Sequence, residues 1–364
     1  MKIAINGFGR IGRIFFRQAL DVSDFEIVAI NDLGELDNLA YLLKYDTVYG
    51  RFEKEVKIEK GEKNYLIIDA KKILFLQEKD PAKLPWKDLK IDVAVESTGV
   101  FESYEKASAH LTAGAKRVVI TAPARNASHS DAGGPAKGPA RNASHSDAGG
   151  GGEGGKTILM GVNEDEFNTC QITSNGSCTT NAVHSVAQIM LENPGIKKAV
   201  LNTIHAYTAT QKTVDGPDAK DWRRGRAAAV NIVPSTTGAA ISVTEAVKGL
   251  KGRFDGIAVR VPLVTGSLAD FTFVSARPTS VEEINNIFRE AAKAPRWKGI
   301  LKVTEEPLVS SDIIREPCAS VVDLSFTKVI DGDLVKILSW YDNEWGYSAI
   351  LIKHVIKAGM AIKK

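Results

Sequence analysis

Residues Lys2–Gly12 read KIAINGFGRIG, and this stretch decides the fold of the amino-terminal half of the chain. Lys2–Asn6 is an apolar strand pattern, and the spacing G-x-G-x-x-G runs directly after it from Gly7 to Gly12. Over residues 11–19 apolar side chains recur at intervals of three and four, as on one face of a helix. A strand, a glycine turn and a helix in this order predict the first half of a dinucleotide-binding β-α-β unit.

Each glycine has a separate role in such a unit. Gly7 permits the tight turn, Gly9 lets the backbone approach a pyrophosphate, and Gly12 allows close packing of helix on strand. The N-terminus of the helix offers unpaired N–H groups and a partial positive charge to the phosphates. We therefore expect this turn to contact the dinucleotide through Gly7, Gly9, Arg10, Ile11 and Gly12.

An acidic residue lies at the expected separation from the glycine turn. Phe25–Ile30 is a second apolar strand pattern, and Asp32 follows it, 20 residues after Gly12. A carboxylate at this position accepts hydrogen bonds from the adenosine ribose hydroxyls and repels a 2′-phosphate. The sequence therefore predicts NAD as the cofactor in preference to NADP.

Two further strand patterns extend the α/β arrangement. Asp92–Val95 leads into Thr98 and Gly99, and Arg117–Ile120 ends just before Thr121. Loops at the carboxyl ends of parallel strands are where such sheets hold ligands. Thr98, Gly99 and Thr121 are therefore candidate contacts on the nicotinamide side of the cofactor.

The composition is that of an ordinary globular chain of two or three domains. The 364 residues are 44% hydrophobic and 25% charged, and no run approaches the ~18–20 apolar residues of a membrane span. A net charge of +3 gives no support for a nucleic-acid partner. The N-terminus lacks a signal-peptide pattern, and three cysteines cannot form a disulfide framework. We therefore expect a cytoplasmic protein without a membrane or nucleic-acid partner.

Glycine is concentrated in one segment, residues 124–155, which holds nine of the 31 glycines and no Val, Ile, Leu, Met or aromatic residue. The sequence PARNASHSDAGG occurs twice, at Pro123–Gly134 and at Pro139–Gly150, so both copies lie within this segment apart from Pro123. Without apolar side chains a segment cannot bury enough surface to offset the entropy of ordering it. We interpret residues 124–155 as a flexible surface insertion.

Three sharper interpretations of the insertion are weaker. Asn126 and Asn142 begin N-x-S glycosylation sequons, but no secretory signal precedes them. The His–Asp pair of each repeat could hold a metal, but both arms are short, and we assign no metal site. The phosphate-loop spacing G-x-x-x-x-G-K-T runs from Gly150 to Thr157, but a strand pattern, Thr157–Met160, follows where a helix is required.

A reactive cysteine is the main candidate in the second half of the chain. The polar run Ser174–Asn181 precedes a helix pattern over residues 183–190, which places Cys178 near a helix N-terminus. The helix dipole there favours a thiolate, and a nearby imidazole would lower the thiol pKa further. His205 is one candidate for that imidazole. His184 lies within the helix, and we expect it to be a packing or surface residue. From these residues alone Cys178 could equally be a buried structural thiol.

The run Ser177–Asn181 (SCTTN) resembles the active-site signature of phosphorylating glyceraldehyde-3-phosphate dehydrogenases. Further motifs of that family follow in the family's order through nearly the whole chain: Asn6–Arg13, Glu96–Gly99, Gly161–Asn163, His205–Thr208, Arg226–Ala229, Thr236–Ala240, Arg260–Pro262 and Trp340–Glu344. The resemblance implies a doubly wound α/β NAD domain of the Rossmann type and an α+β catalytic domain with an antiparallel sheet. These would span residues 1–177 and 178–343, with residues 344–364 as a helix that returns to the NAD domain.

The resemblance also implies roles for individual residues. Cys178 matches the nucleophile, His205 its base, and Asn343 the contact to the nicotinamide carboxamide. The pocket for the substrate's phosphate matches Thr208, Thr210, Arg224 and Arg260, with Arg223 or Arg226 as substitutes for Arg224. The site of the attacking inorganic phosphate matches Ser177, Thr179, Thr237 and Gly238, with Arg260 near both sites.

The implied reaction is the oxidation of glyceraldehyde 3-phosphate by NAD, with inorganic phosphate, to 1,3-bisphosphoglycerate through a cysteine thioester. The family resemblance also implies a homotetramer, with the loop Tyr207–Asn231 at a subunit interface. The chain departs from the family at Ala182, where a second cysteine is frequent, at Gly176, where alanine is common, and at the insertion. Two alternatives are an erythrose-4-phosphate dehydrogenase and a catalytically idle nucleotide- or RNA-binding scaffold.

Overall fold

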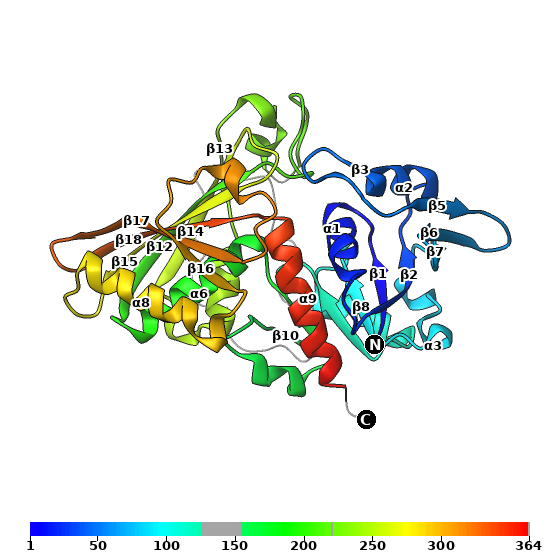
Figure 1. Ribbon diagram of the computed structural model, residues 1–364, viewed down its shortest axis with the longest axis horizontal. Helices are drawn as coiled ribbons and strands as arrows, with labels where there is room; N and C mark the ends of the chain where they lie inside the picture. Colours follow the sequence, from blue (N-terminus) through cyan, green and yellow to red (C-terminus); the bar gives the residue numbers. More distant parts are fainter. Residues whose placement is uncertain (125–153, 220, 363–364) are drawn as a thin grey trace. The chain divides into compact units, whose positions relative to one another are not determined.

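The computed structural model describes residues 1–124, 154–219 and 221–362. These residues divide into two compact units. Figure 1 shows the chain coloured from the N-terminus (blue) to the C-terminus (red). The first unit contains residues 1–124, 154–176 and 348–362, and the second contains residues 177–219 and 221–347. Within the described ranges, no helix is both long enough and apolar enough to cross a membrane.

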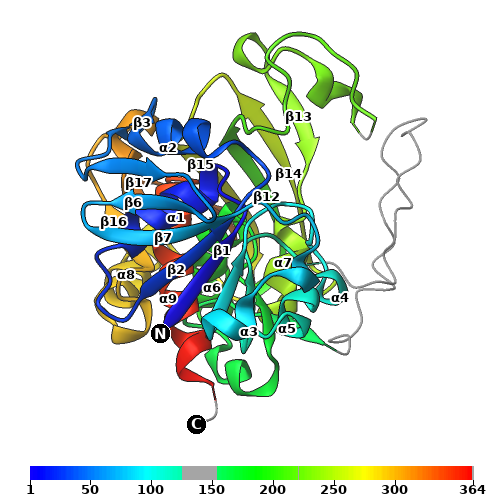
Figure 2. The ribbon, with the colours of Figure 1, turned by 90° about the vertical axis from the view of Figure 1, so that its right-hand side faces the viewer.

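The first unit is built on a nine-stranded sheet in the order β10-β11-β9-β8-β1-β2-β7-β6-β5. Its strands are β1 Lys2–Asn6, β2 Glu26–Asn31, β5 Val56–Glu59, β6 Asn64–Ile68, β7 Lys71–Leu76, β8 Val93–Glu96, β9 Arg117–Ile120, β10 Gly155–Thr157 and β11 Ile172–Ser174. The strands from β10 to β7 run parallel, and β6 and β5 are antiparallel to their neighbours. Because β1 pairs with both β2 and β8, the order of the strands reverses beside it (Figure 2). Such a switch point is where open α/β sheets bind ligands.

Helices pack against this sheet, and its strands β8 and β9 are buried on both faces, whereas β5 at one edge alternates between half-buried and exposed residues. The helices are α1 Arg10–Ala19, α2 Leu36–Lys44, α3 Trp86–Leu89, α4 Tyr104–Ala107, α5 Ala109–Thr112 and α9 Trp345–Met360, and β3 Tyr45–Asp46 forms a small hairpin with β4 Gly50–Arg51. One core cluster joins Ala4 and Ala94 of the central strands to Trp86 of α3. At the other end of the chain, Gly359 of α9 lies against Met1 and Val93. The predicted Rossmann-type α/β arrangement is confirmed.

The bounds predicted for the strand Thr157–Met160 are wrong, because the strand begins two residues earlier and ends three residues earlier. The strand is β10, and its register pairs Gly155 with Ile172 and Thr157 with Ser174 of the equally short β11. Gly155 is buried, and a Cβ there would lie 2.2 Å from the Tyr104 ring. Gly155 therefore belongs to the sheet and not to an insertion. The last three residues of the phosphate-loop spacing, Gly155–Thr157, form this strand and not the start of a helix, as expected for a chance match. Residues 125–153, which carry the sequons and the His–Asp pairs, lie outside the described residues.

The second unit is built on a seven-stranded sheet in the order β13-β14-β12-β15-β18-β17-β16. Its strands are β12 Ile196–Ala206, β13 Val233–Thr236, β14 Phe254–Val261, β15 Ser267–Ser275, β16 Leu301–Thr304, β17 Ser320–Ile330 and β18 Leu334–Tyr341. Most pairs are antiparallel, as predicted, but β12–β14 and β16–β17 are parallel, so the sheet is mixed.

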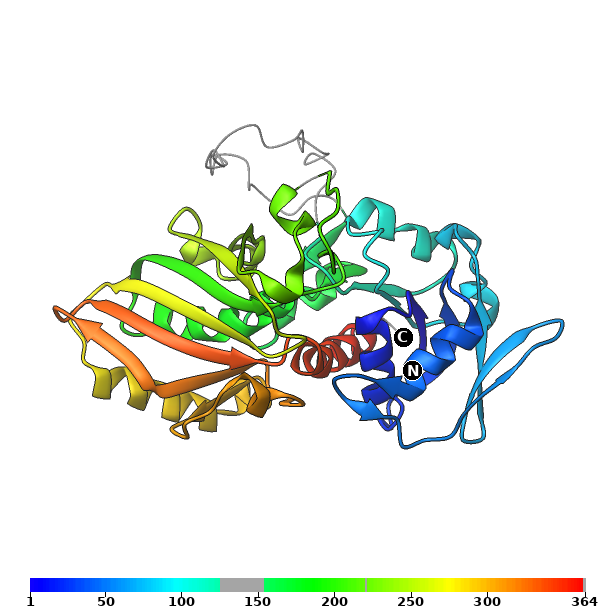
Figure 3. The same ribbon diagram turned by 90° about the horizontal axis from the view of Figure 1, so that it is seen from above.

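Two long helices, α6 Cys178–Glu192 and α8 Val281–Lys293, pack on strands of this second sheet (Figures 1 and 3). The remaining helices are α7 Ala239–Ala246, which contacts α6, and the short turns η5 Trp222–Gly225, η6 Ala228–Val230, η7 Lys248–Leu250, η8 Pro295–Trp297 and η9 Ser310–Ile313. His184 of α6 is buried beside Trp297, and its Nδ1 lies 2.9 Å from the carbonyl oxygen of Asn181. The prediction that His184 is a packing residue is confirmed.

Candidate active site

The glycine turn of the first unit is tightly enclosed except at one position. Gly7 has φ +94°, and a Cβ there would lie 2.5 Å from the backbone nitrogen of Thr98. A Cβ on Gly12 would lie 2.1 Å from the Gly7 carbonyl oxygen. Among the described residues, no heavy atom beyond the neighbouring residues of the chain lies within 4 Å of the Cβ position of Gly9. The turn is therefore shaped by close packing on the sheet side and is open at the N-terminus of α1.

The chemistry around this opening fits a dinucleotide. Gly9 is the N-cap of α1 and provides no side-chain acceptor, so no side-chain cap competes with an anion for the first-turn N–H groups. Asp32 lies just past β2, where its carboxylate accepts hydrogen bonds from Phe8 N (2.6 Å) and Gly34 N (2.8 Å). These two bonds fix the carboxylate while leaving lone pairs for ribose hydroxyls. Arg10 pairs with Asp46 at 2.6 Å, and Ile11 is half-buried in the first turn of α1.

The other predicted cofactor residues of this unit gather where β8 and β9 end. Thr98 N donates to a Glu96 carboxylate oxygen at 2.8 Å, and Thr121 N donates to the Glu96 carbonyl oxygen at 2.9 Å. Gly99 is exposed and has φ +73°, a left-handed conformation that suits glycine. All three therefore lie at the carboxyl edge of the parallel strands, and their contact with a nicotinamide stays a prediction.

In the second unit, the predicted nucleophile and base lie side by side. Cys178 is the first residue of α6, whose N-cap Ser177 accepts a hydrogen bond from Thr180 N at 3.0 Å. His205 comes from β12, and its Nε2 lies 3.3 Å from Cys178 Sγ. Its other ring nitrogen, Nδ1, lies 2.6 Å from the Ala206 carbonyl oxygen. In the tautomer whose Nδ1 proton points to that carbonyl oxygen, Nε2 presents a lone pair to the thiol, as a general base requires. In the other tautomer, Nδ1 accepts from Arg260 Nη1, 2.5 Å away.

The expected lowering of the Cys178 pKa is wrong for the resting site. Burial raises the pKa of the Cys178 thiol, and the opposing influences of Arg260 and of hydrogen bonds from Thr179 are smaller. Burial and the positive charge of Arg260 lower the pKa of His205 to about 3. The helix terminus was visible in the sequence, whereas the loss of water around both groups was not. Both pKa shifts favour the uncharged thiol and the uncharged imidazole in the resting site.

Tyr341 also lies in this site, although no role was predicted for it. Its hydroxyl lies 2.9 Å from Thr179 Oγ1 and 2.7 Å from Thr203 Oγ1, and its ring contacts His205 edge to face. A hydrogen bond from the Thr179 hydroxyl lowers the pKa of the Cys178 thiol. Either hydroxyl can be the donor in each contact of Tyr341, and the Thr203 hydroxyl also donates to the Leu268 carbonyl oxygen at 3.4 Å. Three buried hydroxyls thus form a chain of contacts that ends beside the sulfur.

Two arginines provide positive charge beside the cysteine and histidine. Arg260 is opposite His205 in the β12–β14 pairing, and its Nη1 lies 2.5 Å from His205 Nδ1 and 3.0 Å from the Ala206 carbonyl oxygen. Arg224 donates from Nε to Ser235 Oγ at 2.9 Å, and its charge lowers the pKa values of both His205 and Arg260. Two such cations near one imidazole favour an anionic ligand.

The structure distinguishes Arg224 from its two possible substitutes. Arg226 is exposed and pairs with Asp215 at 2.9 Å, and Arg223 is exposed on η5. Neither is among the groups that shift the pKa of His205, whereas Arg224 is. Arg224 is therefore the candidate that faces the cysteine site.

The remaining phosphate-site candidates lie on the segments around these groups. Thr208 Oγ1 and Thr210 Oγ1 are 3.0 Å apart in the loop after β12. Gly238 is the N-cap of α7 and gives that helix no side-chain cap, and Thr237 Oγ1 accepts from Ala239 N at 3.2 Å. Helix α7 contacts α6, the helix that Ser177 caps, and a phosphate site shared by their two N-termini stays a prediction. The Thr179 hydroxyl, by contrast, points to Cys178 and Tyr341.

Asn343 is held in one orientation by three donors. Its Oδ1 accepts from Ser267 Oγ (3.0 Å), Gly266 N (3.1 Å) and Thr265 Oγ1 (3.3 Å). These bonds assign the amide, since only the oxygen can accept. The Asn343 NH₂ group is thereby turned away from them as a fixed donor, which suits the predicted contact to a carboxamide oxygen.

The departure at Gly176 has a backbone reason. Gly176 has φ +65°, in the left-handed region that glycine adopts without strain, and its N–H donates to Ser174 Oγ at 3.0 Å. The residue therefore suits the sharp turn between β11 and α6.

Comparison with known families and proteins gives one consistent result. The family model "Glyceraldehyde 3-phosphate dehydrogenase, NAD binding domain" matches residues 1–104, and the model of the C-terminal domain of the same family matches residues 177–343. The chain is 43% identical over 362 residues to glyceraldehyde-3-phosphate dehydrogenase of Streptomyces coelicolor, covering 99% of this chain and 98% of that protein. It is 42% identical over 356 residues to glyceraldehyde-3-phosphate dehydrogenase 1 of Trichoderma koningii, covering 98% and 96%. With both domain models matched and relatives aligned along the full chain, this protein belongs to the glyceraldehyde-3-phosphate dehydrogenase family.

Proposed function

We propose that this protein oxidises glyceraldehyde 3-phosphate with NAD and inorganic phosphate to 1,3-bisphosphoglycerate. The observation that carries the proposal is the Cys178–His205 pair, 3.3 Å apart, with Arg260 against the histidine. This set provides a nucleophile, a neutral base and a cation for a phosphorylated aldehyde. A catalytically idle scaffold would have no need for it.

The first step is attack of Cys178 on the aldehyde. The carbon–sulfur bond forms while His205 Nε2 takes the thiol proton, and the former carbonyl oxygen then receives that proton to give a hemithioacetal. The Cys178 backbone N–H, at the N-terminus of α6, donates to the developing oxyanion. The hydrogen bond from Thr179, whose hydroxyl also contacts Tyr341, favours the anionic sulfur as the proton leaves.

The second step oxidises the bound carbon. His205 removes the hydroxyl proton as a hydride departs from the same carbon, and the product is a thioester on Cys178. When bound, NAD supplies the hydride acceptor for this step. Asn343 would orient the carboxamide of the cofactor through its fixed NH₂ group.

The third step transfers the acyl group to phosphate. An oxygen of inorganic phosphate attacks the thioester carbon, the carbon–sulfur bond breaks, and the Cys178 sulfur regains a proton. Arg260, with the α7 N-terminus at Thr237 and Gly238, would hold that phosphate, and Arg224 with Thr208 and Thr210 would hold the phosphate of the substrate. Planar guanidinium groups and helix N-termini suit dianionic oxygens.

The test is the formation of NADH from glyceraldehyde 3-phosphate, measured by absorbance with and without inorganic phosphate. We expect a phosphate-dependent rate that Cys178→Ser abolishes. Arg224→Gln should raise the KM of the aldehyde, and Arg226→Gln, which alters a neighbouring exposed arginine, is the matched control. A phosphate-independent rate would contradict the mechanism, and a faster reaction with erythrose 4-phosphate would reassign the substrate.

We also propose that the protein forms a homotetramer in the cytoplasm. In the second unit, several large apolar side chains of one sheet and its adjoining segment are exposed: Val200, Val230, Ile232 and Ile257. Such a group of side chains is typical of a subunit interface. All three cysteines are free, which agrees with a reducing compartment. Light scattering should give the mass of four chains, and Ile257→Glu should lower that mass if this surface is the interface.

A further inference from the structure

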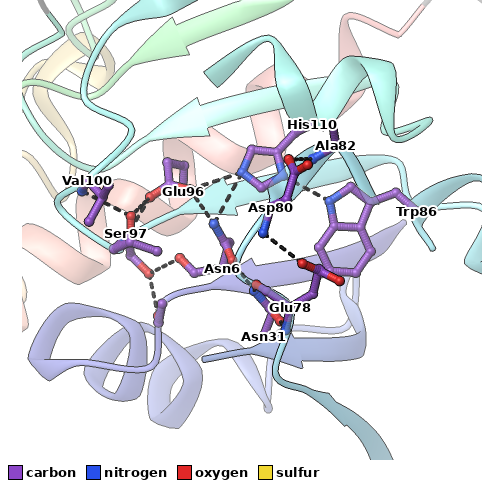
Figure 4. A network of polar contacts seen from close by, with 12 residues as sticks. Asn6, Asn31, Glu78, Asp80, Ala82, Trp86, Glu96, Ser97, Val100 and His110 are labelled. Carbon is purple, nitrogen blue, oxygen red and sulfur yellow. Dashed lines mark hydrogen bonds and ion pairs between the residues drawn. The ribbon is translucent and has the colours of Figure 1, made fainter. Parts of the chain in front are cut away.

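A buried chain of hydrogen bonds in the first unit takes no part in the chemistry described above (Figure 4). It runs from Trp86 of α3 through His110 of α5 to Glu96 at the end of β8. The tryptophan and the histidine are fully buried, and the glutamate is 2% exposed. Burying a carboxylate is costly unless donors surround it, so this arrangement calls for a reason.

The donors in this chain fix the proton of His110. The indole N–H of Trp86 can only donate, and it lies 3.0 Å from His110 Nδ1. Nδ1 therefore carries no proton, and the single proton of the neutral ring lies on Nε2. That N–H donates to Glu96 Oε2 at 3.0 Å. Trp86 thus selects the tautomer in which His110 is a donor to the carboxylate.

Glu96 uses both oxygens to hold neighbouring backbone and side chains. Its Oε2 also accepts from Asn6 Nδ2 at 2.6 Å, and its Oε1 accepts from Thr98 N at 2.8 Å and from the Thr98 hydroxyl. With two donors on each oxygen, the carboxylate has no place for a proton of its own. The chain therefore ends on Asn6 and Thr98, which flank the glycine turn from two strands.

Both ends bear directly on the shape of the glycine turn. Thr98 N is the atom that a Gly7 Cβ would strike at 2.5 Å, so the position of this loop defines the tight side of the turn. The adjacent Ser97 hydroxyl donates to the Gly7 carbonyl oxygen at 2.6 Å. Asn6 Oδ1 accepts from Asn31 Nδ2 at 2.7 Å, which ties the end of β1 to the end of β2 just before Asp32.

We propose that Trp86, His110 and Glu96 are positioning residues for the NAD site, acting through Thr98 and Asn6 on the glycine turn. The inference rests on the proposed binding of NAD at this turn. None of the three touches the cofactor in this proposal; they set the distance between the β8 loop and Gly7. Loss of any of them should weaken NAD binding and leave the cysteine chemistry of the second unit intact.

Glu96→Gln is the sharpest test, because the side chain keeps its size. Whichever end receives the NH₂ group then faces two donors, so the loop or the turn must move. We expect the dissociation constant of NAD, measured by calorimetry, to rise about tenfold or more. Trp86→Phe removes only the donor that sets the tautomer and should have a smaller effect in the same direction. The rate at which iodoacetamide alkylates Cys178 in the absence of NAD should be unchanged in both variants.

His354→Asn is the matched control. His354 is equally buried in the same unit, but its Nε2 bonds to Thr173 Oγ1 at 2.7 Å, away from Glu96. It should lose thermal stability without losing NAD affinity. A folded Glu96→Gln protein with wild-type NAD affinity would overturn the proposal, as would an equal loss of NAD affinity in His354→Asn. If Glu96→Gln does not fold, the NAD affinity of Trp86→Phe decides by the same criteria. Asp32→Ala separates the two claims: if it too leaves NAD affinity unchanged, the proposed NAD site is itself wrong.

Discussion

Replacing Tyr341 with phenylalanine tests whether the chain of buried hydroxyls tunes Cys178. The substitution removes one oxygen that lies 2.7 Å from Thr203 Oγ1 and 2.9 Å from Thr179 Oγ1 and leaves the ring in place. If the hydroxyl protons of the chain point toward the sulfur, Thr179 keeps its bond to Cys178 but loses the donor that polarises its hydroxyl. Reactivity of the thiol should therefore fall without loss of the Cys178–His205 geometry.

The size of the effect follows from the position of each hydroxyl in the chain. A hydrogen bond to a charged group contributes about 1.5–3 kcal/mol, so Thr179→Val should lower the thiolate population about 10- to 150-fold. Cooperative polarisation strengthens such a bond by about 10–30%, or about 0.2–0.9 kcal/mol here. Tyr341→Phe should therefore lower the thiolate population only about 1.3- to 5-fold. Thr203→Val, one bond further from the sulfur, should have the smallest effect.

The assay is the second-order rate of alkylation of Cys178 by iodoacetamide below the pKa of the thiol, since only the thiolate reacts. Tyr341→Phe and Thr203→Val each remove buried hydrogen bonds worth about 1 kcal/mol. Thermal melting, with about 2–4 °C lost per kcal/mol, checks that both stay folded. The reasoning predicts a graded order of rates, lowest for Thr179→Val. An unchanged rate in Tyr341→Phe, or a larger loss in Thr203→Val than in Thr179→Val, would refute the directed chain.

Two further predictions concern stability and the cofactor turn. Burial lowers the pKa values of His205 and His354 to about 3 from 6.5, so the unfolded chain binds protons that the folded chain excludes, and stability is lost as pH falls from 6.5 toward 3. Between these pH values each histidine contributes about 1.4 kcal/mol per pH unit to the slope of the free energy of unfolding against pH. Denaturant titrations at several pH values should give a shallower slope for His354→Asn, and an unchanged slope would contradict the buried neutral ring. Gly7→Ala should unfold the turn because its Cβ strikes Thr98, whereas Gly9→Ala, in open space, should keep the melting temperature and weaken NAD binding; equal melting losses would argue against this geometry.

Local patterns in the sequence were enough to predict the parts of the site that depend on neighbouring residues. The turn between β1 and α1, with Asp32 after β2, and the position of Cys178 at the start of α6 all follow from spacing and capping. The contacts around Cys178 depend instead on sheet pairing. Arg260 meets His205 across 55 residues because β12 and β14 pair in parallel, and Tyr341 meets Thr179 across 162 residues. The pattern of apolar residues within one segment does not show which residues far away in the sequence will contact it.

The same distinction explains why the sign of the Cys178 pKa shift was mispredicted. A helix N-terminus is a local feature and stabilises a thiolate by a modest amount, whereas burial is a property of the whole unit and penalises every charge inside it. For His205, Arg260 adds its repulsion to the penalty of burial. The pairing of Cys178 with His205 was implied by the family resemblance, whereas the directions of their pKa shifts depend on burial that no local pattern reports.

The resting charges of the site bear on how a phosphorylated substrate is selected. The neutral pair of Cys178 and His205 lies beside Arg260 and Arg224, and both cations oppose a proton on His205. In the proposed function these arginines hold a dianionic phosphate, which would offset their repulsion, so binding of the substrate would raise the basicity of His205 when the thiol proton must leave. The phosphate would then increase the rate of attack as well as the affinity, because the arginines that bind it are the cations that lower the pKa of His205. An aldehyde without a phosphate would meet a thiol and an imidazole whose proton exchange is still disfavoured, however well the carbonyl is placed.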